Sequence, residues 1–165
     1  MRPPLSALSL GLLLALVPAW GASAQQAEVS FGGLEQDTSQ PVTIDSDSLS
    51  LNNADGTALF SGNVLVVQGD LRLSAGEIRV EYAEDRSGIE RLHASGGVLI
   101  VSLSDAAQSR EAVYTIASGQ VVMTGDVLLT QGATAIAGQT LRLDLKSGTG
   151  VVEGRVSTTF VPGGN

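Results

Sequence analysis

Apolar and polar residues alternate with a period of two through most of the sequence, and this alternation limits the fold more than any other feature. The clearest cases are residues 71–73 (LRL), 78–82 (IRVEY) and 141–145 (LRLDL). Strands with this pattern bury one face and expose the other. No stretch keeps a helical stripe for three turns, and turn-forming residues recur at short intervals. The sequence therefore predicts an all-β domain of roughly a dozen or more short strands.

A second feature is a four-residue phrase that occurs four times: a polar residue, glycine, a variable residue and valine. Its glycines are Gly62, Gly96, Gly125 and Gly154, with spacings of 34, 29 and 29 residues. A strand of another kind precedes each copy, at 47–51, 77–82, 112–116 and 140–144. The chain is therefore predicted to repeat one hairpin-like strand pair four times.

Residue parity predicts that the glycine of each phrase lies on the apolar face of its strand. In the first copy Phe60, Val64 and Val66 share a face with Gly62, and the other three copies have the same parity. A glycine on an inner face marks a bend, a bulge or a close approach of another group to the backbone. Two interpretations stay open: curvature of the sheet, or space for a ligand.

The first 24 residues have the features of a cleavable secretory signal peptide. They combine the positive Arg2, a leucine-rich stretch and the small residues Ala22 and Ala24. An uncleaved membrane anchor is the alternative, but Pro18 interrupts the stretch, which is shorter than the ~20 residues of a spanning helix. The predicted organisation is a signal peptide at 1–24, a flexible segment at 25–39, one domain at 40–162 and a flexible tail at 163–165.

Charge and composition exclude several function classes. The chain has 9 Lys and Arg against 17 Asp and Glu, and Lys146 is its one lysine, so neither nucleic acid nor an anionic membrane surface is an expected partner. There is no cysteine, which removes thiol catalysis and cysteine metal sites. The one histidine, His93, lies at a predicted strand end, and no G-x-S-x-G motif accompanies the serines to indicate a triad. Asp45, Asp47 and Asp55 lack the spacing of a calcium loop. We expect no enzyme activity, no cofactor and no metal site.

Three stretches carry a resemblance to a known family. They are QPVTIDSDSLSLNNADGTALFSGNVLVVQGDLRLSAGEIRV at 40–80, VVMTGDVLLTQG at 121–132 and GRVSTTFVP at 154–162. Together they resemble the OstA-like family of periplasmic lipopolysaccharide-transport proteins over residues 40–162. The resemblance implies a single open-ended, twisted antiparallel β-jellyroll whose apolar interior shields the acyl chains of lipid A. It also implies head-to-tail stacking between an inner-membrane-anchored component and an outer-membrane barrel component.

The resemblance and the parity together give the candidate site residues. By resemblance, Val42 and Ile44 line the interior from the first strand, and Tyr114 and Ile116 line it from the middle of the chain. Parity adds Val64, Val66, Ile78, Val80, Val98, Ile100, Val127, Leu141 and Leu143. Unpaired edge strands are expected near 41–51 and 151–161, and they would bind partners through Val42, Ile44, Val156 and Phe160.

Other functions remain as alternatives. A structural β-repeat protein, such as a parallel β-solenoid without lipid cargo, would also use repeated strands, although its coils usually repeat more evenly. Within the family, an inner-membrane-anchored component would share the fold. An enzyme ranks last, because no paired carboxylates or histidine site can be placed.

Overall fold

The computed structural model describes residues 26–30 and 34–161, which form thirteen β-strands. The expected signal peptide at 1–24 and tail at 163–165 lie outside the described residues. No helix in the described ranges is long and apolar enough to span a bilayer. In chain order the strands are β1 (Gln26–Ser30), β2 (Thr43–Asp45), β3 (Ser48–Asn52), β4 (Thr57–Gln68), β5 (Leu71–Tyr82), β6 (Ile89–Ser95), β7 (Val98–Ser102), β8 (Asp105–Ser109), β9 (Glu111–Thr115), β10 (Gln120–Gln131), β11 (Thr134–Asp144), β12 (Thr149–Glu153) and β13 (Ser157–Phe160).

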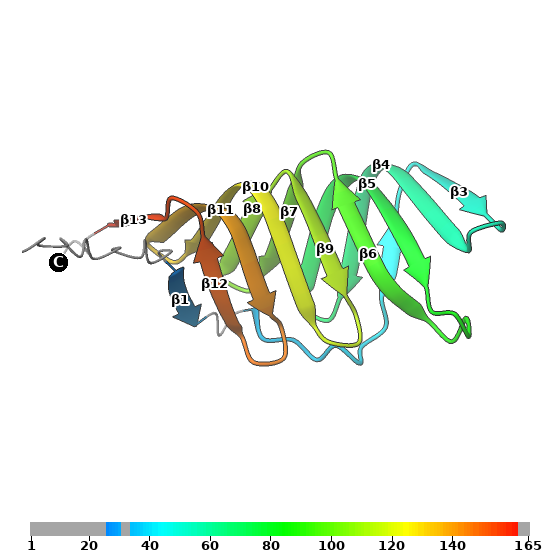
Figure 1. Cartoon of the computed structure of the whole chain (residues 1–165), viewed down its shortest axis with the longest axis horizontal. Coiled ribbons are helices and arrows are strands. Elements are labelled where there is room, and N and C mark those ends of the chain that lie inside the picture. Colours follow the sequence, from blue (N-terminus) through cyan, green and yellow to red (C-terminus); the bar gives the residue numbers. More distant parts are fainter. Residues whose placement is uncertain (1–25, 31–33, 162–165) are drawn as a thin grey trace, which may run out of the picture.

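The strands form two layers that share four long strands, β4, β5, β10 and β11. One layer contains β6 and β9 but not β7 or β8, and is called the β6–β9 layer. Its order is β1-β12-β11-β10-β9-β6-β5-β4-β3. The other layer contains β7 and β8 and is called the β7–β8 layer. Its order is β13-β11-β10-β8-β7-β5-β4-β2. All of these pairings are antiparallel, and the molecule is elongated, with β3 at one end and β13 at the other (Figure 1). The prediction of an open-ended, twisted antiparallel β-jellyroll is confirmed.

Each of the four glycine phrases lies where the chain bends from one layer into the other. The glycine and the residue after it both have positive φ, from +46° at Asn63 to +84° at Gly97. In β4 and β10 the pairing register shifts at these residues, which is a β-bulge. Positive φ is strained for a residue with a Cβ atom, so glycine is favoured there. The repeated phrase therefore marks positions at which the chain bends from one layer into the other.

Gly62 and Gly125 do not face the apolar interior, so the parity prediction for them is wrong. A Cβ atom at Gly62 would stand 2.5 Å from the exposed side chain of Asp47, and one at Gly125 would stand 2.6 Å from Nε of the exposed Arg110. Parity counts faces correctly only along an extended chain, and two successive residues with positive φ interrupt the alternation. Of the two interpretations, the structure supports curvature.

Replacing Gly125 with alanine is expected to lower the free energy of unfolding by about 1–3 kcal/mol. The new Cβ would add strain at φ +83° and would crowd Arg110. Urea-induced unfolding measures the loss. Gly132→Ala is the matched control, because Gly132 also has positive φ, +54°, but a Cβ there would meet no atom within 4 Å. An unchanged stability in Gly125→Ala would contradict the requirement for glycine at the bend.

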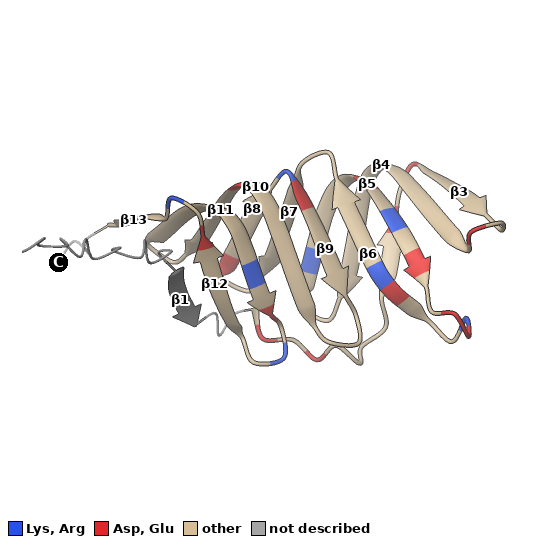
Figure 2. Cartoon of the chain, in the orientation of Figure 1, with Lys and Arg blue, Asp and Glu red and all other residues tan. Residues whose placement is uncertain are grey.

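Charged residues lie on the outer faces of the strands and in the turns (Figure 2). On the outer face, Arg142 on β11 pairs with Glu153 on β12 at 3.2 Å, and both side chains are partly exposed. Asp105 at the start of β8 is a buried exception, and its carboxylate accepts a hydrogen bond of 3.2 Å from the side-chain amide of Gln131. Apart from a few buried polar side chains, among them Asp105 and Gln68, the space between the layers is filled by apolar side chains.

Candidate functional site

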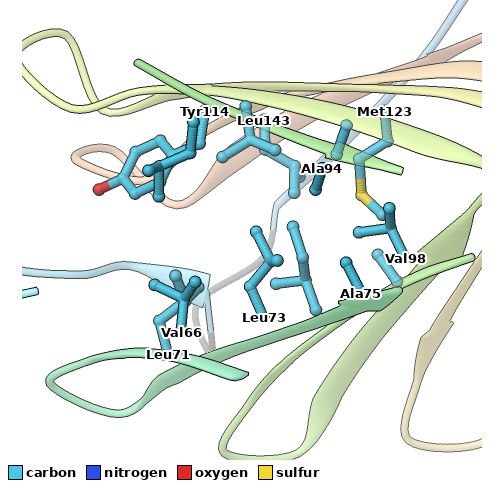
Figure 3. Close-up of a cluster of buried hydrophobic side chains, with 14 of the residues drawn as sticks. Val66, Leu71, Leu73, Ala75, Ala94, Val98, Tyr114, Met123 and Leu143 are labelled. Atoms are coloured by element: carbon cyan, nitrogen blue, oxygen red, sulfur yellow. The ribbon is translucent and has the colours of Figure 1, made fainter. Parts of the chain in front are cut away.

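The candidate site is the interior between the two layers. Figure 3 shows Leu73 of the β7–β8 layer pointing toward Tyr114 and Leu143 of the β6–β9 layer. The inward side chains form one continuous cluster that involves strands from both ends of the sheet. Of the residues predicted to line the interior, ten are buried in this cluster, namely Val64, Val66, Ile78, Val80, Val98, Ile100, Tyr114, Val127, Leu141 and Leu143, and three are partly buried against it, namely Val42, Ile44 and Ile116.

The interior is filled by the protein's own side chains. The buried members of the cluster are 0–8% exposed, so they contact one another across the two layers. The alternation of apolar and polar residues identified most of these side chains, because a strand with a period of two buries one of its faces. The same alternation places Leu71, Leu73, Met123 and Leu129 on the inner side, and they are equally buried, at 0–1% exposure. A guest can therefore occupy this space only if the layers separate or the side chains move.

One polar pair lies inside the apolar interior. The hydroxyl of Tyr114 on β9 donates a hydrogen bond of 2.6 Å to the side-chain oxygen of Gln68 at the end of β4. Burial raises the pKa of Tyr114 to about 12, so the hydroxyl stays protonated and remains a donor at neutral pH. The amide of Gln68 donates to the backbone carbonyls of Thr38 and Gln40. The sequence did not indicate a role for Gln68, because a polar residue that follows a run of apolar residues is typical of the end of a strand.

The two ends of the sheet are open edges. At one end β2 and β3 each pair with β4 alone among the described strands, and at the other end β13 pairs with β11 alone. Leu51 on β3 and Phe160 on β13 are 64% and 70% exposed. Val156, just before β13, packs partly against the core.

The expected edge at 151–161 is only partly open. β12 pairs on one side with β11 and on the other with β1, in the register Gln26 to Glu153 through Ser30 to Thr149. β1 lies within the segment 25–39, which was expected to be flexible and instead contributes a strand. Its pairing partner is more than a hundred residues away, so local sequence could not indicate it. The open part of this edge is β13.

The chain matches a known protein family and two relatives. The family model described as LptA/(LptD N-terminal domain) LPS transport protein matches residues 43–149. The lipopolysaccharide export system protein LptA of Escherichia coli strain K12 is 30% identical over 137 residues, which cover 79% of this chain and 71% of that protein. An uncharacterized protein of Rhizobium meliloti strain 1021 is 29% identical over 168 residues, covering 95% of this chain and 90% of the relative.

A solved structure has the same fold. It is the crystal structure of LptH, the LptA-homologous periplasmic component of the lipopolysaccharide transport device of Pseudomonas aeruginosa, with a TM-score of 0.69 over 77% of this chain and 99% of that one. At 18% identity this likeness concerns the fold alone. The family match covers most of the two-layer sheet, including three of its four glycine bends. The chain therefore belongs to the LptA/LptD N-terminal domain family of lipopolysaccharide transport proteins.

Proposed function

We propose that this protein binds lipopolysaccharide in the periplasm and passes it along a bridge between an inner-membrane-anchored component and an outer-membrane barrel component. The observation that carries the proposal is the apolar cluster, which draws on strands from the β2 end to the β13 end of an open-ended sheet. Membership of a lipopolysaccharide transport family supports it, and so do the signal-peptide features of residues 1–24.

The interior suits acyl chains better than sugars. Its buried apolar side chains are aliphatic apart from Tyr114 and Met123, whereas sugar rings are usually held by stacking on aromatic faces. Each CH₂ group transferred from water to such a surface is stabilised by about 0.8 kcal/mol. Neighbouring subunits with similar interiors would hold the lipid about equally well, so cargo could move between them while the driving force came from another component.

The open edges supply a means of assembly. β2 and β3 at one end and β13 at the other leave backbone groups available to pair with a strand of a neighbouring molecule. Head-to-tail pairing of this kind would align the interiors of successive copies, with Val42 and Ile44 near one junction and Val156 and Phe160 near the other. The same pairing would join the end subunits to the two membrane components.

A photo-crosslinking experiment tests lipid binding. A photoreactive amino acid is placed at Ile116 or at Ile44, both of which pack against the core, and the purified protein is irradiated with rough lipopolysaccharide. We expect crosslinked lipopolysaccharide from both positions. Leu99 is the matched control, because this aliphatic residue on β7 is 41% exposed on the outer face and should capture at least fivefold less. Equal capture at Leu99 and Ile116 by folded protein would contradict binding between the layers.

The alternative of a parallel β-solenoid is wrong, since all strand pairs in the described residues are antiparallel. The filled interior, in contrast, is the feature expected of a structural β-repeat protein without lipid cargo. The proposal therefore requires that the two layers can part.

A further inference from the structure

The segment from Leu34 to Gln40, called the strap below, runs along the edge of the molecule where the turns of both layers meet. It is the light-blue chain along the lower edge in Figure 1. At the opposite side each long strand continues from one layer into the other through its bend, so the layers are covalently joined there. The turn edge is consequently where the two layers can separate without breaking strands.

The strap contacts the β6–β9 layer at two turns. The backbone N–H of Gln36 donates a hydrogen bond of 2.7 Å to the carbonyl of Leu145, in the turn between β11 and β12. Thr38 lies beside Gly119, in the turn between β9 and β10, so that a Cβ atom at Gly119 would stand 3.2 Å from Cγ2 of Thr38.

The strap also contacts the β7–β8 layer. The side-chain amide of Gln36 donates to the hydroxyl of Ser102 at the end of β7, at 2.7 Å. The side-chain amide of Gln68 donates to the carbonyls of Thr38 and Gln40, at 3.0 and 2.9 Å. One short segment therefore bonds the turn edges of both layers.

A single apolar side chain anchors the strap. Leu34 is 1% exposed and belongs to the apolar cluster between the layers. The rest of the strap is polar, and Glu35, Asp37, Ser39 and Gln40 are exposed. Each hydrogen bond to the strap contributes modestly to its closure, because water replaces the partner on release. The strap can therefore detach at far lower cost than unfolding of the strands, whose ladders and core stay intact.

We propose that the strap is a releasable closure of the turn edge, and that acyl chains pass between the layers there only after it detaches. Detachment withdraws Leu34 from the interior and frees the turn edges of both layers, so the layers can open about their glycine bends. The Tyr114–Gln68 bond then remains as a second tie between the layers, one that also positions the Gln68 amide toward the strap. This inference rests on the proposed function, because it concerns how the lipid reaches the same interior.

A reversible disulfide tests the closure. The sequence contains no cysteine, so the double variant Thr38→Cys, Gly119→Cys offers one disulfide that can lock the strap to the β9–β10 turn. The photoreactive residue at Ile116 reports capture of rough lipopolysaccharide. We expect the oxidised protein to capture at least fivefold less than the same protein after reduction, and the reduced form to match the parent. The reduced form carries the same substitutions, so it controls for strain at Gly119.

The outcomes separate the two proposals. Equal capture in the oxidised and reduced states overturns the closure and leaves lipid binding in place. Absence of capture in the parent protein overturns the proposed function, and the closure with it.

A second variant tests release without a disulfide. In Gln68→Glu the carboxylate can still accept the bond from Tyr114 but cannot donate two hydrogen bonds to the strap carbonyls. We expect two- to fivefold faster capture at position 116. Gln108→Glu makes the same change on the exposed face of β8 and should leave the rate unchanged. An unchanged rate in Gln68→Glu would overturn the closure.

Discussion

Replacing Leu141 with alanine is expected to lower the free energy of unfolding by about 2–5 kcal/mol. Leu141 lies on β11, its side chain is fully buried, and it faces the interior of the β6–β9 layer. The substitution removes three carbon atoms from contact with the opposite layer, and the surrounding strands can relax only in part because their register is fixed by neighbours on both sides. Urea-induced unfolding followed by circular dichroism measures the change.

Leu99→Ala is the matched control for Leu141→Ala. Leu99 is also a strand leucine, but it points outward from β7 and is 41% exposed, so its loss should cost less than about 1 kcal/mol. Equal losses in the two variants would contradict the two-layer packing. The comparison also bears on the proposed transport, because an acyl chain bound between the layers would have to replace the interior contacts of Leu141.

Replacing Thr158 with proline is expected to weaken the proposed head-to-tail assembly about tenfold or more. The N–H of Val161 donates to the carbonyl of Ala133, which fixes which backbone groups of β13 face β11. Since these groups alternate along a strand, the N–H of Thr159 also faces β11, and those of Thr158 and Phe160 face outward. Proline at 158 removes an outward donor, and its ring occupies the space of an approaching strand.

The adjacent position provides the control for this prediction. Thr159→Pro removes the donor that faces β11, so it should loosen β13 from its own sheet and change the stability of that strand. Thr158→Pro should leave stability nearly unchanged while reducing assembly. Sedimentation velocity over a range of concentrations measures association, and hydrogen exchange at Ala135 reports the pairing of β13 with β11. If Thr158→Pro assembled at the same protein concentrations as the parent, β13 would be ruled out as the edge that pairs with a neighbouring subunit.

Much of the fold could be predicted because alternation is a local property. A period of two placed Val64, Ile78 and Leu141 on the inner side without reference to any other strand, and the structure buries all three. The hairpin pairs were also predictable, because β3 with β4, β5 with β6, β9 with β10 and β11 with β12 are neighbours in sequence. That the inward side chains bind lipid stays a prediction.

The orientation of the phrase glycines could not be predicted in the same way. Parity assumes an extended backbone, whereas Gly62 and Asn63 both take positive φ and break the alternation between Phe60 and Val64. The glycines were recognised as special from their repetition. Their conformation depends on the neighbouring bends, between β2 and β3 and between β8 and β9, where Asp47 and Arg110 occupy the space that a side chain would need.

The sequence by itself determined that this protein is all-β, built from repeated strand pairs, with an aliphatic inner face and an acidic exterior. Those properties follow from residue type and spacing, which act over a few neighbouring residues. Only the tertiary structure decided that β1 pairs with β12 and that Leu34 to Gln40 bridges the two layers. These contacts join residues about 30 to more than 100 positions apart, through one strand pairing, single hydrogen bonds and one buried leucine, and no local periodicity encodes them.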